Sequence, residues 1–234
     1  GAEPWVEPDV LDWLTFEEHR LRAITGGAVF WDGLQPGLPA ARARLAYYPR
    51  EVWLYLMAAQ WAKIGQEEPF VGRAGSVGDE LGSAVIAGRL AGALMRLCFL
   101  MERQYAPYSK WFGTAFSRLA CAPEMIVPLQ AALRANAWQA REAALGAALQ
   151  AAARLHNRLG LTEALPERVS AFHGRPFQVI HAEEFARVLA AQISDPRVRA
   201  LPANVGSVNQ WVESVDVLES VGLCARLKGV YGKG

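Results

Sequence analysis

Three arginines recur every seven residues in the most hydrophobic stretch of the chain: Arg89, Arg96 and Arg103. On an α-helix this spacing places all three within about 40° of one another on a single stripe. A guanidinium group does not lose its proton in a protein, so each buried member needs a carboxylate, a carbonyl or an anionic ligand beside it. The stripe therefore predicts either an internal ion-pair network or a polar cavity for an anionic or polyhydroxylated ligand.

Carboxylates for an internal network are available nearby. Asp79 and Glu80 fall in the first turn of the same predicted helix, and Glu67 shares a face with Gln60 and Lys63 on the preceding one. The first interpretation is thus a buried network that joins Arg73, Arg89 and Arg96 to Glu67, Asp79 and Glu80. If such a network lined a cleft, it could both pair the arginines internally and bind a ligand.

The segment RQYAPYSKWFG, residues 103–113, places aromatic and cationic side chains at the end of this helix. Pro107 ends or kinks the helix after Tyr105, so Tyr105, Tyr108, Lys110 and Trp111 are presented at a helix end. Two phenols, an ammonium and an indole suit the stacking of a base and the neutralisation of phosphate. In the alternative interpretation, Trp111 and Phe112 start the next helix as core anchors while Lys110 extends to solvent.

The elements that must position these residues are mainly helical. The pattern predicts a helical bundle around a long buried central helix, and a loop-rich C-terminal third with at most one or two short strands. We predict a single helical domain with three parts: short N-terminal helices and turns at 1–46, the core bundle at 47–160, and a C-terminal extension at 161–234. Helices are predicted at 12–25 (with a Thr15–Glu18 capping box), 39–46, 50–68, 77–105, 128–160 (with a break at Asn136), 182–193 and 208–220, and a strand at 176–181.

The central helix at 77–105 is apolar nearly all round, as expected for the middle of a bundle. Gly78 with Gly82, and Gly88 with Gly92, form pairs four residues apart that would let another backbone approach closely. Residues 69–78 between the two central helices are predicted to be a loop. Arg89 and Arg96 interrupt the best candidate for a membrane span, so no membrane association is expected.

The bulk composition argues against several classes of protein. The chain has 234 residues, 52% of them hydrophobic, and a formal net charge of +1, which argues against a nucleic-acid footprint. Three cysteines without a CxxC spacing predict free buried thiols rather than disulfides or a zinc site. The N-terminus is not a signal peptide, and we expect a cytoplasmic protein.

Four blocks of the sequence, residues 47–73, 78–116, 175–181 and 206–218, resemble domain-of-unknown-function family 4037. This bacterial family is seen as the helical C-terminal portion of predicted polymerase-β-type nucleotidyltransferases. The resemblance implies that the helical domain helps to hold a nucleoside triphosphate and a polar acceptor at an interdomain face. Combined with the residues above, the predicted site comprises Glu67, Arg73, Asp79, Glu80, Ser83, Arg89, Arg96, Tyr105, Tyr108, Lys110 and Trp111.

The catalytic half of such an enzyme is not recognisable in this sequence. It needs Gly-Ser followed by Asp-x-Asp on a strand, because alternate strand positions direct both carboxylates at one Mg²⁺ pair. The nearest match, Gly206-Ser207 with Asp216 and Glu219, has the wrong spacing. The chain thus resembles the C-terminal part of a larger protein, or a relative without the catalytic half. Mg²⁺ with nucleotide is implied only for a complete enzyme, and an N-terminal catalytic domain would be the partner.

Other activities remain open as alternatives. One is a noncatalytic structural or regulatory domain whose arginine network is internal. Another is a helical ribonuclease, because Arg168 and His173 fit the R-x4-H pattern of small ribonuclease toxins, although the flanking prolines and glycines predict a loop there. His173, His181 and Glu183 could bind a metal, but their spacing across a strand has no preferred geometry, and no metal site is predicted. An apolar face freed by loss of a partner domain could drive self-association.

Overall fold

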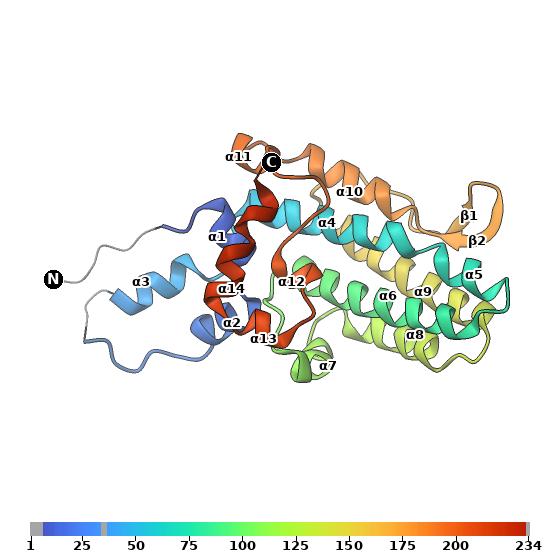
Figure 1. The fold of residues 1–234 in the computed structure, drawn as a ribbon, viewed down its shortest axis with the longest axis horizontal. Helices are drawn as coiled ribbons and strands as arrows, with labels where there is room; N and C mark the ends of the chain where they lie inside the picture. Colours follow the sequence, from blue (N-terminus) through green and yellow to red (C-terminus); the bar gives the residue numbers. More distant parts are fainter. Residues whose placement is uncertain (1–6, 34–36, 233–234) are drawn as a thin grey trace.

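The protein is built almost entirely of helices (Figure 1). The computed structural model describes residues 7–33 and 37–232, and within them the mainly α prediction is confirmed. The longer helices pack side by side: α4 (Arg50–Glu67), α6 (Glu80–Met101), α8 (Ala122–Arg134), α9 (Trp138–Arg158) and α10 (Ala182–Ala191).

The remaining elements are short. N-terminal to the bundle lie α1 (Val10–Thr15), α2 (Glu18–Thr25) and α3 (Gly37–Arg44). Within the bundle lie α5 (Phe70–Gly75), the 3₁₀ turn η1 (Ser109–Trp111) and α7 (Phe112–Phe116). The C-terminal region contains β1 (Ser170–Phe172), β2 (Arg175–Val179), α11 (Pro196–Arg199), α12 (Val208–Trp211), α13 (Val215–Leu218), α14 (Val221–Arg226) and η2 (Leu227–Tyr231).

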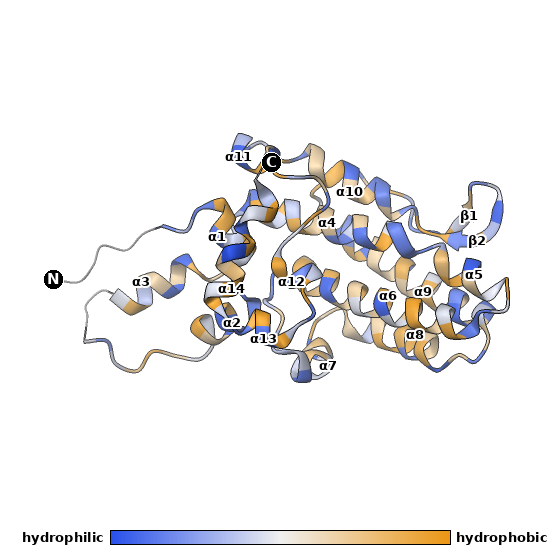
Figure 2. Ribbon diagram, viewed as in Figure 1, coloured by the Kyte–Doolittle hydropathy of each residue, from blue (hydrophilic) through white to orange (hydrophobic). Residues whose placement is uncertain are grey.

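The helix α6 lies at the centre of the bundle and contacts α4, α5, α8 and α9. One side of it is closely packed, with Leu90, Leu94 and Leu97 at most 2% exposed. By length and composition α6 could cross a membrane, but 56% of its most apolar window is buried inside the protein. Figure 2 shows hydrophobic residues running through the bundle, while the β1–β2 end is more hydrophilic. The predicted central helix, apolar nearly all round, is confirmed, but it is only partly buried because one stripe of α6 is open.

The central helix is shorter than predicted at both ends. Asp79 caps it, accepting a hydrogen bond from the Gly82 amide at 2.7 Å, and it ends at Met101 instead of Tyr105. Arg103 follows with a positive φ of 53°, so it leaves the helical stripe that the seven-residue spacing predicted. Its guanidinium lies 5.0 Å from the ring centroid of Trp53 and 5.3 Å from that of Tyr47. Arg103 is exposed, so it needs no internal counter-charge, and its cation–π contacts lie at the protein surface.

Several other boundaries differ from the prediction. The predicted helix 12–25 is divided into α1 and α2 at Phe16, and its capping box is formed by Asp9 and Asp12 rather than by Thr15 and Glu18. Residues 70–75 form α5 rather than a loop, and the predicted helix 208–220 is divided into α12 and α13. The break at Asn136 is confirmed, but α8 begins at Ala122 and contains Pro128.

The predicted strand at 176–181 is confirmed as β2, which pairs antiparallel with β1. The chain then enters α10 through His181, whose φ is 59°. Glu68, at the end of α4, fixes this junction, because its two carboxylate oxygens accept hydrogen bonds from the Ile180 amide at 2.7 Å and the Ala182 amide at 2.9 Å. Burial raises the pKa of Glu68 to about 7 against these hydrogen bonds, which lower it.

The raised pKa of Glu68 predicts a pH-dependent stability. Between pH 4.5 and 7 the native state binds this proton and the unfolded state does not, so stability falls as pH rises. Relative to Glu68→Gln, the wild type should gain about 2 kcal/mol of unfolding free energy on going from pH 7 to pH 5. The difference between the two proteins, measured by urea unfolding, isolates Glu68 from buried His156, whose pKa of about 4 gives an opposite slope. A difference that does not change with pH would contradict this assignment.

Candidate functional site

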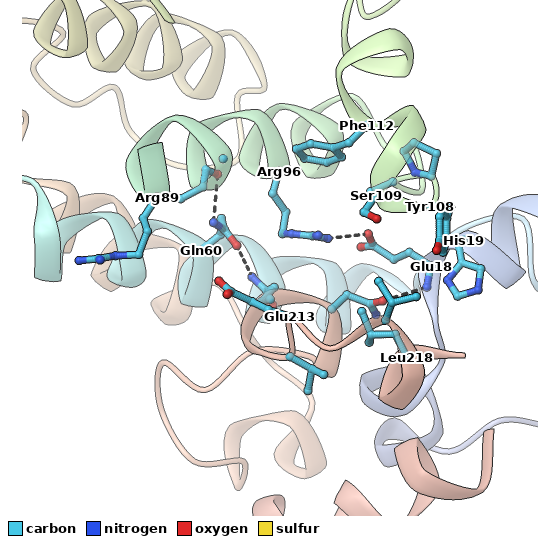
Figure 3. A pocket seen from close by; sticks show the side chains of 18 of the residues that line it. Glu18, His19, Gln60, Arg89, Arg96, Tyr108, Ser109, Phe112, Glu213 and Leu218 are labelled. Carbon is cyan, nitrogen blue, oxygen red and sulfur yellow. Dashed lines mark hydrogen bonds and ion pairs between the residues drawn. The ribbon is translucent and has the colours of Figure 1, made fainter. Parts of the chain in front are cut away.

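A cavity of about 590 Å³ opens against the exposed stripe of α6 (Figure 3). Its other walls come from α2, from the end of α4, from residues 106–112 and from the C-terminal segment 209–219. These segments lie far apart in the sequence, and the C-terminal elements α12, α14 and η2 pack against α1 (Figure 1). The cavity is therefore a product of the tertiary fold rather than of one local motif.

The stripe of α6 that faces the cavity alternates small and cationic residues. Gly88, Arg89, Gly92 and Arg96 all line it. A Cβ atom added at Gly88 or Gly92 would meet nothing within 4 Å. These glycines thus leave room for the cavity, and the prediction that another backbone approaches them closely is wrong.

Arg96 extends across the cavity to a carboxylate that the sequence analysis did not identify. Its Nη1 atom lies 2.9 Å from Oε2 of Glu18, as Figure 3 shows. The other carboxylate oxygen of Glu18 accepts a hydrogen bond from the Tyr48 hydroxyl at 3.1 Å. The Glu18 side chain is 6% exposed and that of Arg96 is 24% exposed. The guanidinium also lies 5.6 Å from the centroid of the Phe112 ring.

Arg89 and Lys63 form the second cationic part of the wall. Arg89 binds Glu67 through Nε, at 3.0 and 3.1 Å from the two carboxylate oxygens, and this pairing raises the pKa of Arg89. Lys63 donates instead to the Gln210 carbonyl at 2.6 Å. Burial, followed by the charge of Arg96, lowers the pKa of Lys63. Of the predicted ion pairs, the structure contains only the one between Arg89 and Glu67.

Three buried amides fasten the C-terminal segment to the rest of the wall. Asn209 accepts from the Glu18 amide at 3.0 Å and donates to the Phe16 carbonyl at 2.8 Å. Gln210 donates to Oε1 of Gln60 at 2.9 Å, and Gln60 donates to the Ala93 carbonyl at 3.0 Å. Because each amide is engaged at both ends, these side chains hold the cavity together and keep little capacity for a ligand.

The segment 106–112 supplies the aromatic and hydroxyl part of the wall. Tyr108, Ser109 and Phe112 line the cavity, and the ring of Tyr108 meets that of His19 edge to face with centroids 6.1 Å apart. Tyr108 is thus the one member of the predicted aromatic cluster that reaches the cavity. Tyr105 is 4% exposed and donates to the Leu45 carbonyl at 3.0 Å.

The other predicted site residues lie outside the cavity. Trp111 is 56% exposed, and the Lys110 ammonium lies 5.5 Å from the centroid of its ring. Lys110 is exposed, as the alternative interpretation of this segment predicted, but Trp111 is not a core anchor. Arg73 is exposed, with its guanidinium 5.2 Å from the centroid of Phe70.

Glu80 and Ser83 bind an arginine from α9 instead of the arginines of α6. The Nη1 atom of Arg141 lies 2.9 Å from Oε2 of Glu80 and donates to the Ser83 hydroxyl at 2.7 Å. This pairing is the main cause that lowers the pKa of Glu80. Asp79 is the N-cap of α6. Of the predicted network of Arg73, Arg89 and Arg96 with Glu67, Asp79 and Glu80, only the pair of Arg89 with Glu67 forms, and the other four residues each have a different partner.

The cavity residues that sequence reasoning missed come mostly from distant segments. Glu18 and His19 were placed in one continuous helix, which concealed that α2 begins at the cavity. Gln60 and Lys63 share a helical face with Glu67 in the sequence pattern, and this polar face of α4 indicates which side of the helix lines the cavity. Asn209, Gln210 and Glu213 lie in the block 206–218 noted for its resemblance, but no spacing rule connects them to α4 or α6.

The candidate ribonuclease residues, Arg168 and His173, lie in the region of the β1–β2 hairpin, at the end of the bundle far from α1 and α2 (Figure 1). His173 occupies the turn between the strands with a φ of 46°, which confirms that the R-x4-H segment is not an active-site helix. His181 lies 3.6 Å from Glu183 through Nδ1 and Oε1. Within residues 7–33 and 37–232, no group of three or more histidine, cysteine or acidic residues could hold a metal ion.

The fold and the cavity define a helical-bundle protein with a mixed-charge polar site on its central helix. Residues 13–112 match a protein family described as Domain of unknown function (DUF4037). The match supports the resemblance noted for residues 47–73 and most of 78–116, and it includes α2, α4 and α6 of the cavity wall. The chain matches no curated protein and no solved structure.

Proposed function

We propose that this chain is the helical ligand-binding domain of a nucleotidyltransferase-like protein, and that it holds a nucleotide or a polar acceptor in the cavity beside α6. The observation that carries the proposal is the open stripe of Gly88, Arg89, Gly92 and Arg96, which faces a cavity on a helix whose other side is closely packed. A helix that only filled a core would gain stability from alanine at both glycines. The space they leave is therefore better explained by a ligand.

The size and lining of the cavity support the proposal. A volume of about 590 Å³ falls within the range of small-molecule sites, which combine apolar walls with a few polar groups. Val85 and Phe112 supply apolar surface, while Arg89, Lys63 and Arg96 supply donors. The family match bears on the helices but names no activity, so the link to nucleotidyl transfer rests on the resemblance noted in the sequence.

A noncatalytic structural domain is the second candidate, and a specific observation favours it. Arg89 and Arg96 each have an internal carboxylate, Glu67 and Glu18, so neither needs an external anion. The two candidates differ in what Arg89 contributes. Because its side chain is 45% exposed, an ion pair there contributes little to stability.

Binding measurements on Arg89→Met separate the two candidates. Under the proposal, at least one of ATP, CTP, their Mg²⁺ complexes and amino or neutral sugars raises the melting temperature of the full chain. Arg89→Met should reduce that rise by at least half, while its own unfolding free energy stays within about 0.5 kcal/mol of the wild type.

Lys110→Ala is the matched control, because Lys110 is exposed and lies outside the cavity. It should leave both ligand binding and stability unchanged. The structural candidate would prevail if none of these compounds stabilised the chain, or if Arg89→Met and Lys110→Ala affected binding equally.

A further inference from the structure

The charges around the cavity are close to balanced. Three cations line it, Lys63, Arg89 and Arg96, together with three carboxylates, Glu18, Glu213 and Glu219. Glu67 adds a fourth carboxylate as the partner of Arg89. With His19 neutral, the net charge of this group is −1. A cavity that had to neutralise the triphosphate of a nucleotide would instead need a clear excess of cations.

The three cationic side chains of the cavity also already have partners within the protein. Arg96 is paired with Glu18, Arg89 is paired with Glu67, and Lys63 donates to the carbonyl of Gln210. An incoming phosphate would have to compete with carboxylates already in place. Moving Glu18 would also deprive the buried Tyr48 hydroxyl of its acceptor.

The two carboxylates of the C-terminal segment, unlike the cations, are not engaged in hydrogen bonds within the described part of the chain. Glu213 faces the cavity from the loop between α12 and α13 (Figure 3), and Glu219 follows α13. Neither carboxylate accepts a hydrogen bond from residues 7–33 or 37–232, although the charge of Glu213 acts on Lys63 and Arg89. The Glu219 backbone carbonyl accepts from Arg20, which fixes this end of the segment. Two of the acceptors open to a ligand are therefore anionic.

Uncharged polar groups complete the lining. The hydroxyls of Tyr108 and Ser109 can donate and accept, and the imidazole of His19 lies beside them. Such groups match the hydroxyls of a sugar-like ring. Their combination with free carboxylates suits a ligand rich in donors rather than a polyanion.

We infer that this cavity is the acceptor half of the proposed nucleotide and acceptor site, and that it takes a polyhydroxylated ligand bearing a protonated amine. The inference rests on the proposed function and narrows it. The amine is bound by the carboxylates of the C-terminal segment, Glu213 and Glu219. The hydroxyls are bound by the segment 106–112 and by the remaining donors of Lys63, Arg89 and Arg96.

A matched series of ring compounds tests the inference on the full chain. Glucosamine carries the amine, N-acetylglucosamine replaces its charge with a neutral amide, and glucose 6-phosphate carries a negative group instead. By calorimetric titration in a buffer that keeps the amine protonated, glucosamine should bind at least about fivefold more tightly than either of the others. Glu213→Gln should weaken glucosamine binding about fivefold, and the double variant with Glu219→Gln should weaken it further.

Glu163→Gln serves as the control, because Glu163 is also exposed and lies outside the cavity. It should leave glucosamine binding unchanged. If N-acetylglucosamine or glucose 6-phosphate bound as tightly as glucosamine, or if all three glutamate variants behaved alike, the inference would be overturned. Binding of ATP that depends on Arg89, without binding of glucosamine, would overturn the inference and leave the proposed function standing. Binding of none of these compounds would overturn both.

Discussion

Replacing Gly92 by leucine should abolish ligand binding while leaving the bundle as stable as before or more so. Gly92 lies in the middle of α6, where a Cβ atom would meet nothing within 4 Å because the position faces the cavity. Replacing a glycine inside a helix removes a cost of about 0.5–1 kcal/mol. The leucine side chain would occupy space needed by the ligand, so we expect affinity to fall at least tenfold.

The matched control for this variant is Gly146→Ala on α9. Gly146 is also inside a long helix, and its added Cβ would meet Val169 at 3.6 Å, an ordinary contact. Both variants should unfold at equal or higher urea concentration than the wild type, and only Gly92→Leu should lose binding. A stable Gly92→Leu protein with unchanged affinity would show that the ligand binds elsewhere.

Replacing Glu18 by alanine should cost about 3–5 kcal/mol of unfolding free energy, the largest effect expected for a single residue of the cavity wall. The change leaves Arg96 without its carboxylate, and it leaves the hydroxyl of Tyr48, a residue that is 1% exposed, without its acceptor. Loss of one partner from a largely buried ion pair destabilises far more than loss of an exposed pair. Chemical unfolding of wild type and variant at the same pH measures the difference.

The double variant Glu18→Leu with Arg96→Met shows whether the cost comes from the unpaired charge. Because it removes both ions and keeps apolar volume, it should recover at least half of the stability lost in Glu18→Ala. Arg89→Met, which breaks an exposed ion pair, should change stability by no more than about 0.5 kcal/mol. A loss below about 1 kcal/mol for Glu18→Ala would mean that this ion pair does not join α2 to α6.

The segments that form helices, and roughly where those helices begin and end, could be predicted from hydrophobic periodicity and from the positions of glycine and proline. The break at Asn136 and the stop at Gly160, which has a φ of 61°, followed from such local signals. The division between α1 and α2 did not, because Thr15 and Glu18 satisfied a capping pattern that Asp9 and Asp12 form instead. Local patterns offer several helix starts, and tertiary contacts such as the bond of Glu18 to Asn209 select among them.

For the site, the sequence pointed to the correct helix but to few of the correct partners. Arg89, Arg96 and Tyr108 reach the cavity, and the argument that buried guanidinium groups need counter-charges was sound. Those counter-charges could not be assigned, because Glu18 lies 78 residues from Arg96 and on a different helix. The sequence points to nearby carboxylates such as Glu80, but in the structure Glu80 pairs with Arg141.

The most direct test of the central claim is a ¹H–¹⁵N NMR titration of the full chain with glucosamine and, separately, with ATP. The claim is that the open stripe of α6 and the C-terminal segment form a ligand site. It predicts that the amide shifts caused by a bound compound cluster at Gly88, Gly92, Ser109 and Asn209. Shifts confined to the β1–β2 hairpin, or the absence of any saturable shift with either compound, would contradict it.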